Sequence, residues 1–217
     1  MFFVLVIAFL SFLLSVTSHG QVKYEWVIER DLGQEEEIYV KAFCKAYENL
    51  SNEALGLKSD DNRALWLQNA CRDRTNTLVC IKNNMHVLHA RSGEKILGFA
   101  VFEETGDKDE VYIVALCVDP AYHRCGIGES LVFKIGQLFP ETKKLVLMTR
   151  KLNVQARDFY IKKCGFKECD YVHEGLSSEY YIGYEWQGDV QKKLEEISLK
   201  NVAAGIEKII GKFEPGS

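Results

Sequence analysis

The chain has 217 residues, of which 47% are hydrophobic and 27% are charged, and its formal net charge is −4. This length supports one sizeable hydrophobic core and is short for two domains. The slightly acidic balance gives no general attraction to nucleic acid or to an anionic membrane surface, and the sequence shows no basic stripe. We therefore expect a single domain with no nucleic-acid partner.

Residues 1–20 carry no charged side chain. Their apolar run, Phe2 to Leu14, is interrupted only by Ser11 and is shorter than the ~20 residues that a membrane-spanning helix needs. Small residues around Ser18 suit a cleavage site, so we interpret this segment as a signal peptide, with an uncleaved anchor or a wrong start site as alternatives. The protein is then secreted or in a secretory-pathway lumen; otherwise it is membrane-anchored or cytoplasmic. We expect no stable membrane insertion unless the segment is retained.

All seven cysteines follow this segment, and their odd number and spacing define no disulfide framework. No C-x-x-C motif occurs. His86 and His89 are three residues apart in a strand-like segment without further ligands nearby, so we expect no metal site. Asn49-Leu50-Ser51 is a glycosylation acceptor only if the chain enters a eukaryotic secretory route; otherwise it is a helix end.

Hydrophobic periodicity and turn residues predict alternating strands and helices along most of the chain. The strands between residues 85 and 118 are separated by turn signals around Gly93 and Gly106, which favours an antiparallel meander. Residues 189–213 have helical spacing, and we expect them to dock on their own domain, with dimerisation or membrane contact as alternatives. In chain order we expect a strand over 22–28, a helix over 36–50, a loop over 50–61, a helix over 63–72, strands over 85–90, 96–103 and 110–118, a helix over 129–138, a strand over 144–148, a helix over 153–163 and two closing strands over 166–172 and 180–186.

The stretch from Val111 to Val132 is typical of a buried strand, a turn and a helix. Asp119-Pro120 ends the strand, because proline cannot donate to a ladder. Gly126 and Gly128 then lead directly into the helix. Glycine lets the backbone approach a ligand, and the free N–H groups of a helix's first turn favour an anion, so we predict a phosphate or pyrophosphate here. The lysine and the Mg²⁺-binding hydroxyl of a nucleotide-binding P-loop are missing, which excludes that class.

Two strings of residues carry a more specific resemblance. Leu116, Val118, Pro120, His123, Gly126 and Gly128 follow the spacing of the acetyl-CoA-binding motif of the GNAT family of N-acetyltransferases, and Asn153, Ala156, Phe159, Tyr160, Gly165 and Phe166 resemble the family's second signature. The resemblance covers roughly residues 22–187. It implies an α/β (α+β) fold with a central, mixed, mostly antiparallel sheet of six to seven strands, flanked by helices and with splayed central strands. Residues 1–20 would precede this domain, and 188–217 would follow as an amphipathic helical tail.

The resemblance implies transfer of an acetyl, or other acyl, group from coenzyme A to an amine by direct attack on the thioester. The resemblance implies that the backbone from Arg124 to Gly128 holds the pyrophosphate, with the Ser130 hydroxyl in reach, and that Leu116 and Val118 offer main-chain groups to the pantetheine arm. Cys117 N–H would polarise the thioester carbonyl. The full set of implied cofactor-binding residues is Leu116, Cys117, Val118, His123, Arg124, Cys125, Gly126, Ile127, Gly128, Ser130 and Asn153.

The implied catalytic residues are Tyr160 and Glu110. Tyr160 matches the family tyrosine that protonates the leaving thiolate, and Asn153 binds the cofactor, caps its helix, or does both. The position that carries a glutamate base in the histone-modifying branch is Tyr112 here, so Glu110 is our candidate base, with Glu103 and Glu104 as alternatives. Each of these carboxylates is also compatible with a solvated strand end.

We therefore predict a GNAT-type N-acetyltransferase, a monomer or homodimer, that acts on a primary amine of a small molecule or protein. The alternative is a non-catalytic acyl-CoA-binding or interaction module of the same fold. The acceptor is not specified by the sequence. A set of aromatic residues would suit an apolar or cationic amine but is equally typical of core and strand positions: Trp66, Tyr112, Tyr180, Tyr181 and Tyr184.

Overall fold

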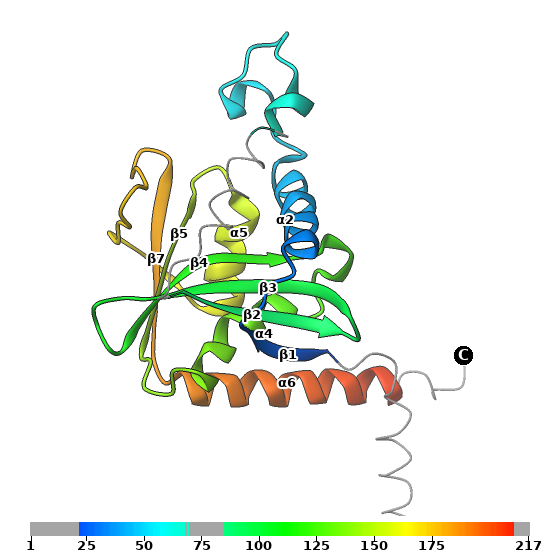
Figure 1. The fold of residues 1–217 in the computed structure, drawn as a ribbon, viewed down its shortest axis with the longest axis vertical. Helices are drawn as coiled ribbons and strands as arrows, with labels where there is room; N and C mark the ends of the chain where they lie inside the picture. The colour runs from blue at the N-terminus through cyan, green and yellow to red at the C-terminus, as the bar shows by residue number, and fades with distance from the viewer. Residues whose placement is uncertain (1–21, 68, 70–84, 211–217) are drawn as a thin grey trace, which may run out of the picture.

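The computed structural model describes residues 22–67, 69 and 85–210. Within this part, seven strands form one sheet in the order β1-β2-β3-β4-β5-β7-β6 (Figure 1). Only β4 and β5 are parallel neighbours. The predicted mixed, mostly antiparallel sheet of six to seven strands flanked by helices is therefore confirmed. The strands are β1 (Lys23–Val27), β2 (Met85–Ser92), β3 (Lys95–Glu104), β4 (Glu110–Val118), β5 (Lys144–Arg150), β6 (Lys167–Cys169) and β7 (Tyr181–Gln187).

Helices cover both faces of the sheet because its strands alternate apolar residues toward each side. On one face Ile38 of helix α2 packs against Val87, Phe99 and Val101. On the other face the residues between these, such as Leu88 and Phe102, share a larger cluster with α4 and α6. The helices are α2 (Leu32–Tyr47), α4 (Ile127–Phe133) with the 3₁₀ segment η3 (Lys134–Gln137), α5 (Val154–Asp158) with the π-helical segment η4 (Phe159–Cys164), and α6 (Val190–Ile210).

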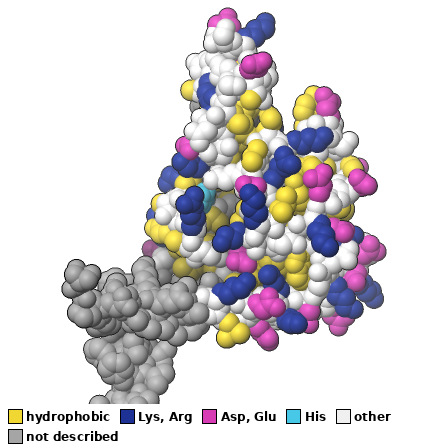
Figure 2. Space-filling view, turned by 180° about the vertical axis from the view of Figure 1, so that it is seen from behind, with side chains coloured by type: hydrophobic (Ala, Val, Ile, Leu, Met, Phe, Trp, Pro, Cys, Tyr) yellow, Lys and Arg dark blue, Asp and Glu magenta, His cyan; other side chains and the backbone are white. Residues whose placement is uncertain are grey.

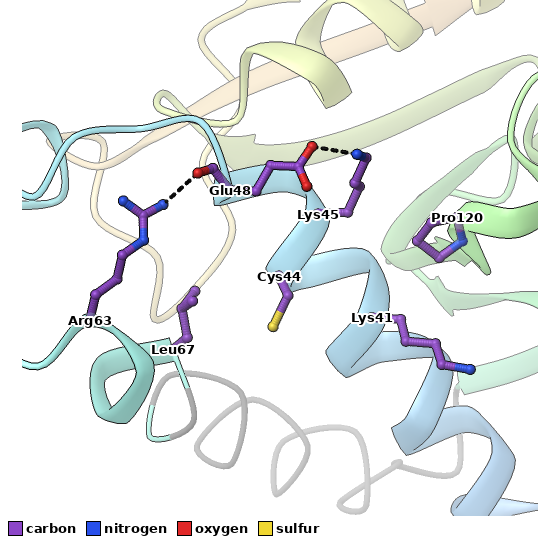
Figure 3. A pocket seen from close by; sticks show the side chains of 7 residues that line it. All are labelled: Lys41, Cys44, Lys45, Glu48, Arg63, Leu67 and Pro120. Atoms are coloured by element: carbon purple, nitrogen blue, oxygen red, sulfur yellow. Dashed lines mark hydrogen bonds and ion pairs between the residues drawn. The ribbon is translucent and has the colours of Figure 1, made fainter.

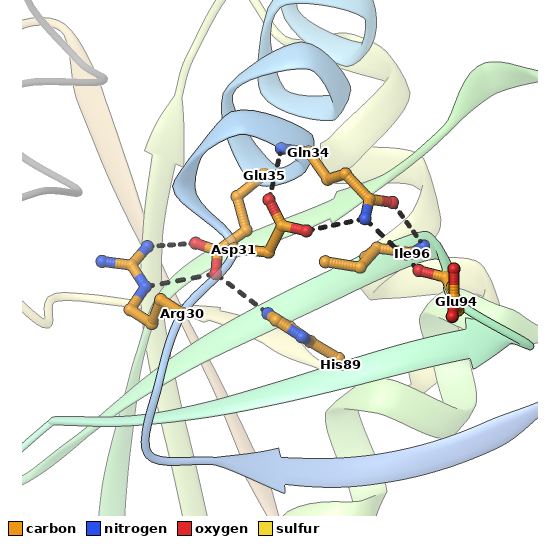
Figure 4. A network of polar contacts seen from close by, with 7 residues as sticks. All are labelled: Arg30, Asp31, Gln34, Glu35, His89, Glu94 and Ile96. Atoms are coloured by element: carbon orange, nitrogen blue, oxygen red, sulfur yellow. Dashed lines mark hydrogen bonds and ion pairs between the residues drawn. The ribbon is translucent and has the colours of Figure 1, made fainter.

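A buried polar network ties the start of α2 to the sheet (Figure 4). Asp31 caps the helix by accepting a hydrogen bond from Gln34 N–H at 3.1 Å. Glu35, 1% exposed, lies between Arg30 and the ring of His89, whose Nε2 is 2.9 Å from Glu35 Oε1. Burial alone would raise the pKa of Glu35, but the bonds from His89 and Arg30 outweigh it and hold the pKa below its usual value. The carboxylate is therefore charged and paired inside the protein.

The two central strands separate at a β-bulge. On β3 the neighbours Val101 and Phe102 pair with Ala115 and Ile113, so Val114 of β4 has no partner in that ladder. Such an extra residue bends its strand and increases the local twist. The pairing of β4 with β5 ends at Ile113. The predicted splaying of the central strands is confirmed, and the bulge gives its physical reason.

The structure revises three element predictions. The helix expected over 129–138 starts at Ile127, and its last turns are 3₁₀. The helix expected over 153–163 changes to π geometry at Phe159. The strand expected over 166–172 is only β6, three residues long. Hydrophobic spacing does not distinguish these helix types, so boundaries and hydrogen-bond pattern needed the structure.

The C-terminal helix docks on its own domain along its first half. Val190 and Ile197 are buried, and a Cβ placed on Gly136 would lie 2.7 Å from Val190 Cγ1. In Figure 1, α6 runs below β1. This agrees with the docking expected from the sequence.

Several predictions concern residues outside the described part. They include the signal peptide at 1–20, the end of the helix expected over 63–72, and Cys71 and Cys80; Arg63 to Leu67 are helical as expected. The five cysteines that the structure describes are unpaired. No helix within the described residues has both the length and the apolar character to cross a bilayer.

Candidate active site

A cavity of about 170 Å³ opens where β4 and β5 separate. Its walls come from α2, the two splayed strands, the start of α5 and η4. Four residues predicted from the sequence meet here: Leu116, Cys117, Asn153 and Tyr160. The full lining is Tyr39, Ile113, Val114, Ala115, Leu116, Cys117, Met148, Thr149, Asn153, Ala156 and Tyr160.

The strand edge in this cavity suits an extended polar ligand. Beyond Ile113, β4 has no ladder with β5, so the peptide groups that point away from β3 have no partner strand there. The free edge belongs to the segment from Val114 to Cys117. A chain that carries its own amides could bind along this edge as an added strand does.

The loop from His123 to Gly128 turns the chain sharply before α4. Arg124 has a φ of 63°, the one positive value of a non-glycine residue among those described, and Gly126 has 79°. A residue with a side chain costs roughly 1–2 kcal/mol in this left-handed backbone conformation. Contacts with neighbouring residues must therefore hold the loop in it. One such contact is the bond that the His123 ring makes from Nε2 to the Val118 carbonyl, at 3.0 Å.

This loop presents free N–H groups at the start of α4. The first intrahelical bond runs from Ser130 N–H to the Gly126 carbonyl at 3.0 Å, which leaves the N–H groups of Ile127 and Gly128 without an intrahelical partner. Cys125 is exposed, and its thiol points back to the His123 carbonyl, 3.6 Å from Sγ. The predicted contribution of Cys125 is therefore confined to its backbone.

The side chain of Ser130 is not brought to the loop surface. It is 4% exposed, and its hydroxyl hydrogen-bonds with Tyr24 of β1. Burial raises the pKa of Tyr24, and the bond from Ser130 opposes part of that effect. Ser130 lies one helical turn after Gly126 and faces the core, so its hydroxyl joins α4 to β1 and does not point to a ligand at the loop.

Tyr160 of η4 lines the cavity. Its ring packs on Phe159 and Phe166, and the residue is 7% exposed. Burial raises the pKa of Tyr160 well above its usual value, with smaller effects from Cys164, Cys117 and Tyr112. The hydroxyl is therefore protonated at neutral pH and available as a hydrogen-bond donor.

Asn153 has the double placement that the sequence suggested. Its Oδ1 accepts a hydrogen bond from Ala156 N–H at 3.0 Å and caps α5. The residue also lines the cavity. Since the cap uses only the oxygen, the amide NH₂ group can serve a ligand.

Glu110, the predicted base, is not brought to the cavity. It lies in the paired half of β4, and its Oε2 is 2.8 Å from Lys144 Nζ. This carboxylate raises the pKa of Lys144 by hydrogen bonding. The ion pair gives Glu110 a structural partner, and neither residue lines the cavity.

The aromatic residues considered for the acceptor do not form one site. Trp66 packs near Phe43 and Tyr47, and Tyr112 stacks on His173. Tyr181 lies under Arg150, whereas Tyr180 is 62% exposed. Tyr184 is fully buried and accepts a hydrogen bond from Arg157 Nε at 3.1 Å.

A second cavity, of about 540 Å³, lies beside the C-terminal half of α2 (Figure 3). It is lined by Lys41, Cys44, Lys45, Glu48, Arg63, Leu67 and Pro120. Its basic side chains already have partners: Lys41 is 2.6 Å from Glu37 Oε1, Lys45 pairs with Glu48, and Arg63 donates to Glu48 O at 3.0 Å. Sequence reasoning missed this cavity, although the i, i+4 spacing of Lys41 and Lys45 on one helix face was a usable signal.

Charges of both signs alternate over the face of the molecule in Figure 2, with no large area of one sign. Among the described residues, no group of three or more His, Cys, Asp or Glu side chains is arranged to hold a metal ion. The cleft between β4 and β5 brings together residues of both sequence signatures: Leu116 of the first and Asn153, Ala156 and Tyr160 of the second.

The fold is that of an α/β protein with a cavity between two splayed strands. A model of the acetyltransferase (GNAT) family matches residues 44–166, more than half of the chain. The chain belongs to the GNAT acetyltransferase family, and the predicted class, a GNAT-type N-acetyltransferase, is confirmed at that level. No curated protein matches the chain by sequence.

Solved structures share the fold at low identity. The PaiA N-acetyltransferase of Thermoplasma acidophilum, solved with coenzyme A, has 16% identity and a TM-score of 0.59 over 77% of this chain and 99% of that chain. The ribosomal-protein-S18-alanine N-acetyltransferase of Escherichia coli has 17% identity and a TM-score of 0.51 over 77% and 94%. An acetyltransferase of Thermus thermophilus has 14% identity and a TM-score of 0.52 over 77% and 97%. These likenesses concern the fold.

Proposed function

We propose that the protein moves an acetyl group from acetyl-CoA to a primary amine of a small molecule or protein by direct attack of the amine on the thioester. The observation that carries this proposal is the cavity between β4 and β5, which is lined by Tyr160 and by a free strand edge. Family membership supports the reaction class, and the PaiA structure contains coenzyme A.

The residues present suit coenzyme A in two places. The strained loop at Arg124 and Gly126 presents N–H groups at the start of α4, which suits a pyrophosphate. The free edge from Val114 to Cys117 suits the amide-bearing pantetheine arm. On this proposal the backbone of Leu116 and Cys117 faces the thioester, where an N–H group stabilises the oxygen that gains charge during attack.

Tyr160 acts on the leaving group. The amine nitrogen bonds to the thioester carbon, the carbon–sulfur bond breaks, and the sulfur leaves with the electron pair of that bond. The buried, protonated hydroxyl of Tyr160 donates a hydrogen bond to this sulfur and relays a proton to it. Positioning of amine and thioester in one cavity supplies a further part of the rate increase.

A non-catalytic acyl-CoA-binding module remains the second candidate, because the structure holds the predicted base Glu110 in an ion pair with Lys144. Cofactor binding alone does not separate the two candidates, whereas turnover does. Secretion and oligomeric state stay predictions from the sequence.

Calorimetric titration with acetyl-CoA tests the proposal. We expect micromolar binding that Gly126→Glu weakens at least tenfold, because a side chain at a φ of 79° is strained and its charge repels phosphate. Gly106→Glu is the matched control, since a Cβ there meets nothing within 4 Å. Absence of binding by the wild-type protein refutes use of acetyl-CoA, and unchanged affinity of Gly126→Glu refutes the loop assignment. Binding without acetylation of any amine supports the non-catalytic module.

A further inference from the structure

Glu103 and Tyr112 are partners in the antiparallel register of β3 and β4. Their side chains therefore lie on the same face of the sheet. Phe99 and Val101, at positions of the same alternation on β3, pack toward α2 together with Cys117. Glu103 thus lies on the face that carries α2, directly across the ladder from Tyr112, the position that carries a glutamate base in the histone-modifying branch.

His173 reaches this pair from the segment between β6 and β7. Its ring stacks on Tyr112 with centroids 4.2 Å apart and an interplanar angle of 16°. Its Nε2 is 3.2 Å from Glu103 Oε2, and its Nδ1 is 2.9 Å from the Glu174 carbonyl oxygen. The backbone N–H of His173 donates to Met148 Sδ at 3.1 Å. Since Met148 lines the cavity, the cluster stands directly beside it.

The carboxylate is within reach of the splayed strands. Tyr112 precedes the bulged residue Val114 by two positions, or about 7 Å along a strand, and Glu103 lies across the ladder at roughly 5 Å between Cα atoms. The side chain of Glu103 is 12% exposed and that of His173 is 27% exposed. Glu103 is not among the residues that line the cavity, so a base at this position would act on an amine there through a water molecule.

The surroundings of this cluster are acidic. Tyr171 also stacks on Tyr112, with ring centroids 5.6 Å apart. Burial raises the pKa of Tyr171 to about 12, and the carboxylates of Glu110 and Glu103 add to this effect. Both carboxylates thus act on Tyr171, and each has a partner of its own: Lys144 for Glu110 and His173 for Glu103.

We infer that Glu103, oriented by His173, takes the proton from the ammonium group of the acceptor. The inference rests on the proposed acetyl transfer and names the base that it lacks. His173 is a positioning residue: its Nε2 lies 3.2 Å from Glu103 Oε2, and because a carboxylate oxygen only accepts, the ring holds Glu103 in the tautomer that carries the proton on Nε2.

The protons balance over the reaction. The ammonium group gives one proton to Glu103, which passes it to solvent, and the neutral amine then attacks the thioester carbon. The amide nitrogen loses its second proton, which ends on the sulfur of coenzyme A through Tyr160. No oxidant, reductant or further reactant is needed.

The chain contains a matched control pair. Glu104, the next residue along β3, contacts His86 at 2.7 Å from Oε1 to Nε2. By strand alternation this pair lies on the opposite face, where His86 packs on Phe139. It has the same composition as the Glu103–His173 pair, but the sheet separates it from the cleft.

The test compares Glu103→Gln, His173→Asn and Glu104→Gln in the full chain, with n-butylamine, 2-phenylethylamine, spermidine and a lysine-containing peptide as acceptors. For the best of these amines we expect Glu103→Gln to lower kcat/KM about 100-fold at pH 7. This loss should shrink about tenfold per pH unit, because the free-amine fraction rises tenfold per unit up to a pKa near 10. His173→Asn should lose about tenfold and keep the pH profile of the wild type. Glu104→Gln should match the wild type throughout.

Acetyl-CoA affinity, measured in parallel by calorimetry, should stay within twofold in all three variants and shows that each is folded. An effect of Glu103→Gln that does not vary with pH, or that equals the effect of Glu104→Gln, overturns the inference and leaves the proposed function standing. Acetyl-CoA binding without acetylation of any of the four amines also overturns it. If the wild-type protein does not bind acetyl-CoA, the proposed function itself falls, and this result is distinct from the others.

Discussion

Gly128 of α4 and Phe159 of η4 are in direct contact: a Cβ on Gly128 would lie 3.1 Å from Phe159 Cζ. One residue belongs to the loop signature and the other to the downstream signature. The second glycine of the loop is thus required by packing, whereas Gly126 is required by its φ of 79°. The two sequence signatures are parts of one packed unit.

We expect Gly128→Val to lower the free energy of unfolding by about 1–3 kcal/mol, because the added side chain overpacks the contact with Phe159. Urea denaturation measures this loss. Gly106→Val, where a Cβ meets nothing within 4 Å, should cost less than about 0.5 kcal/mol, as is usual for surface positions. Adding Phe159→Leu to Gly128→Val should recover part of the loss. Equal effects at both glycines would remove packing as the reason for Gly128.

Tyr160→Phe should lower kcat about 100-fold and leave acetyl-CoA affinity within twofold, because it removes a proton donor and keeps the ring. Steady-state kinetics and calorimetry measure the two quantities. Tyr184→Phe is the matched control, since this fully buried tyrosine bonds to Arg157 outside the cavity lining. It should affect stability and leave kcat unchanged. A Tyr160→Phe enzyme with wild-type kcat would exclude the phenol as the acid.

Glu35→Gln should destabilise the protein by about 3 kcal/mol at pH 7, because it leaves Arg30 and His89 without their buried carboxylate. The pKa of Glu35 is lowered in the folded state, so its contribution is present above the unfolded pKa and is lost as the pH falls through the folded value. The difference between variant and wild type should therefore shrink below about pH 4. Denaturation curves from pH 7 to pH 3 test this, with exposed Glu36→Gln as control.

Cys117→Ala should change how stability depends on alkaline pH. Burial, with a smaller effect from Glu35, raises the pKa of Cys117 to about 12. The unfolded thiol ionises near pH 8.5 while the folded one keeps its proton, so wild-type stability falls as the pH rises between these values. Removal of this thiol should reduce the slope by about 1.4 kcal/mol per pH unit. Urea denaturation of both proteins from pH 8 to pH 10.5 measures the slope.

The sequence was informative where local pattern and structure coincide. The strand expected over 110–118 has these bounds in the structure, and the spacing of Gly126 and Asn153 placed both at helix starts. The sheet class followed from the resemblance and from the turn signals. Each of these inferences depends on residues close together in the chain.

The residues that sequence reasoning misplaced depend on contacts between distant segments. Glu110 forms an ion pair with Lys144, 34 positions later, and the Ser130 hydroxyl hydrogen-bonds with Tyr24. His173 was not considered, because its partner Glu103 is 70 positions away. Alternation along a strand predicts the face on which a side chain lies but not the residue that it contacts. The segment between β6 and β7 contains no motif from which the contact of His173 with Glu103 could be predicted.

The bulge at Val114 also shifts the phase of β4. Before it, Val111 and Ile113 face the cluster that contains α4; after it, Leu116 and Val118 do, and Cys117 faces α2. Five positions separate Tyr112 from Cys117, an odd step that a regular strand would place on opposite sides. Because of this one inserted residue, Tyr112 and Cys117 lie on the same face of the sheet. Deletion of Val114 would move the side chains from Ala115 to Val118 to the opposite face.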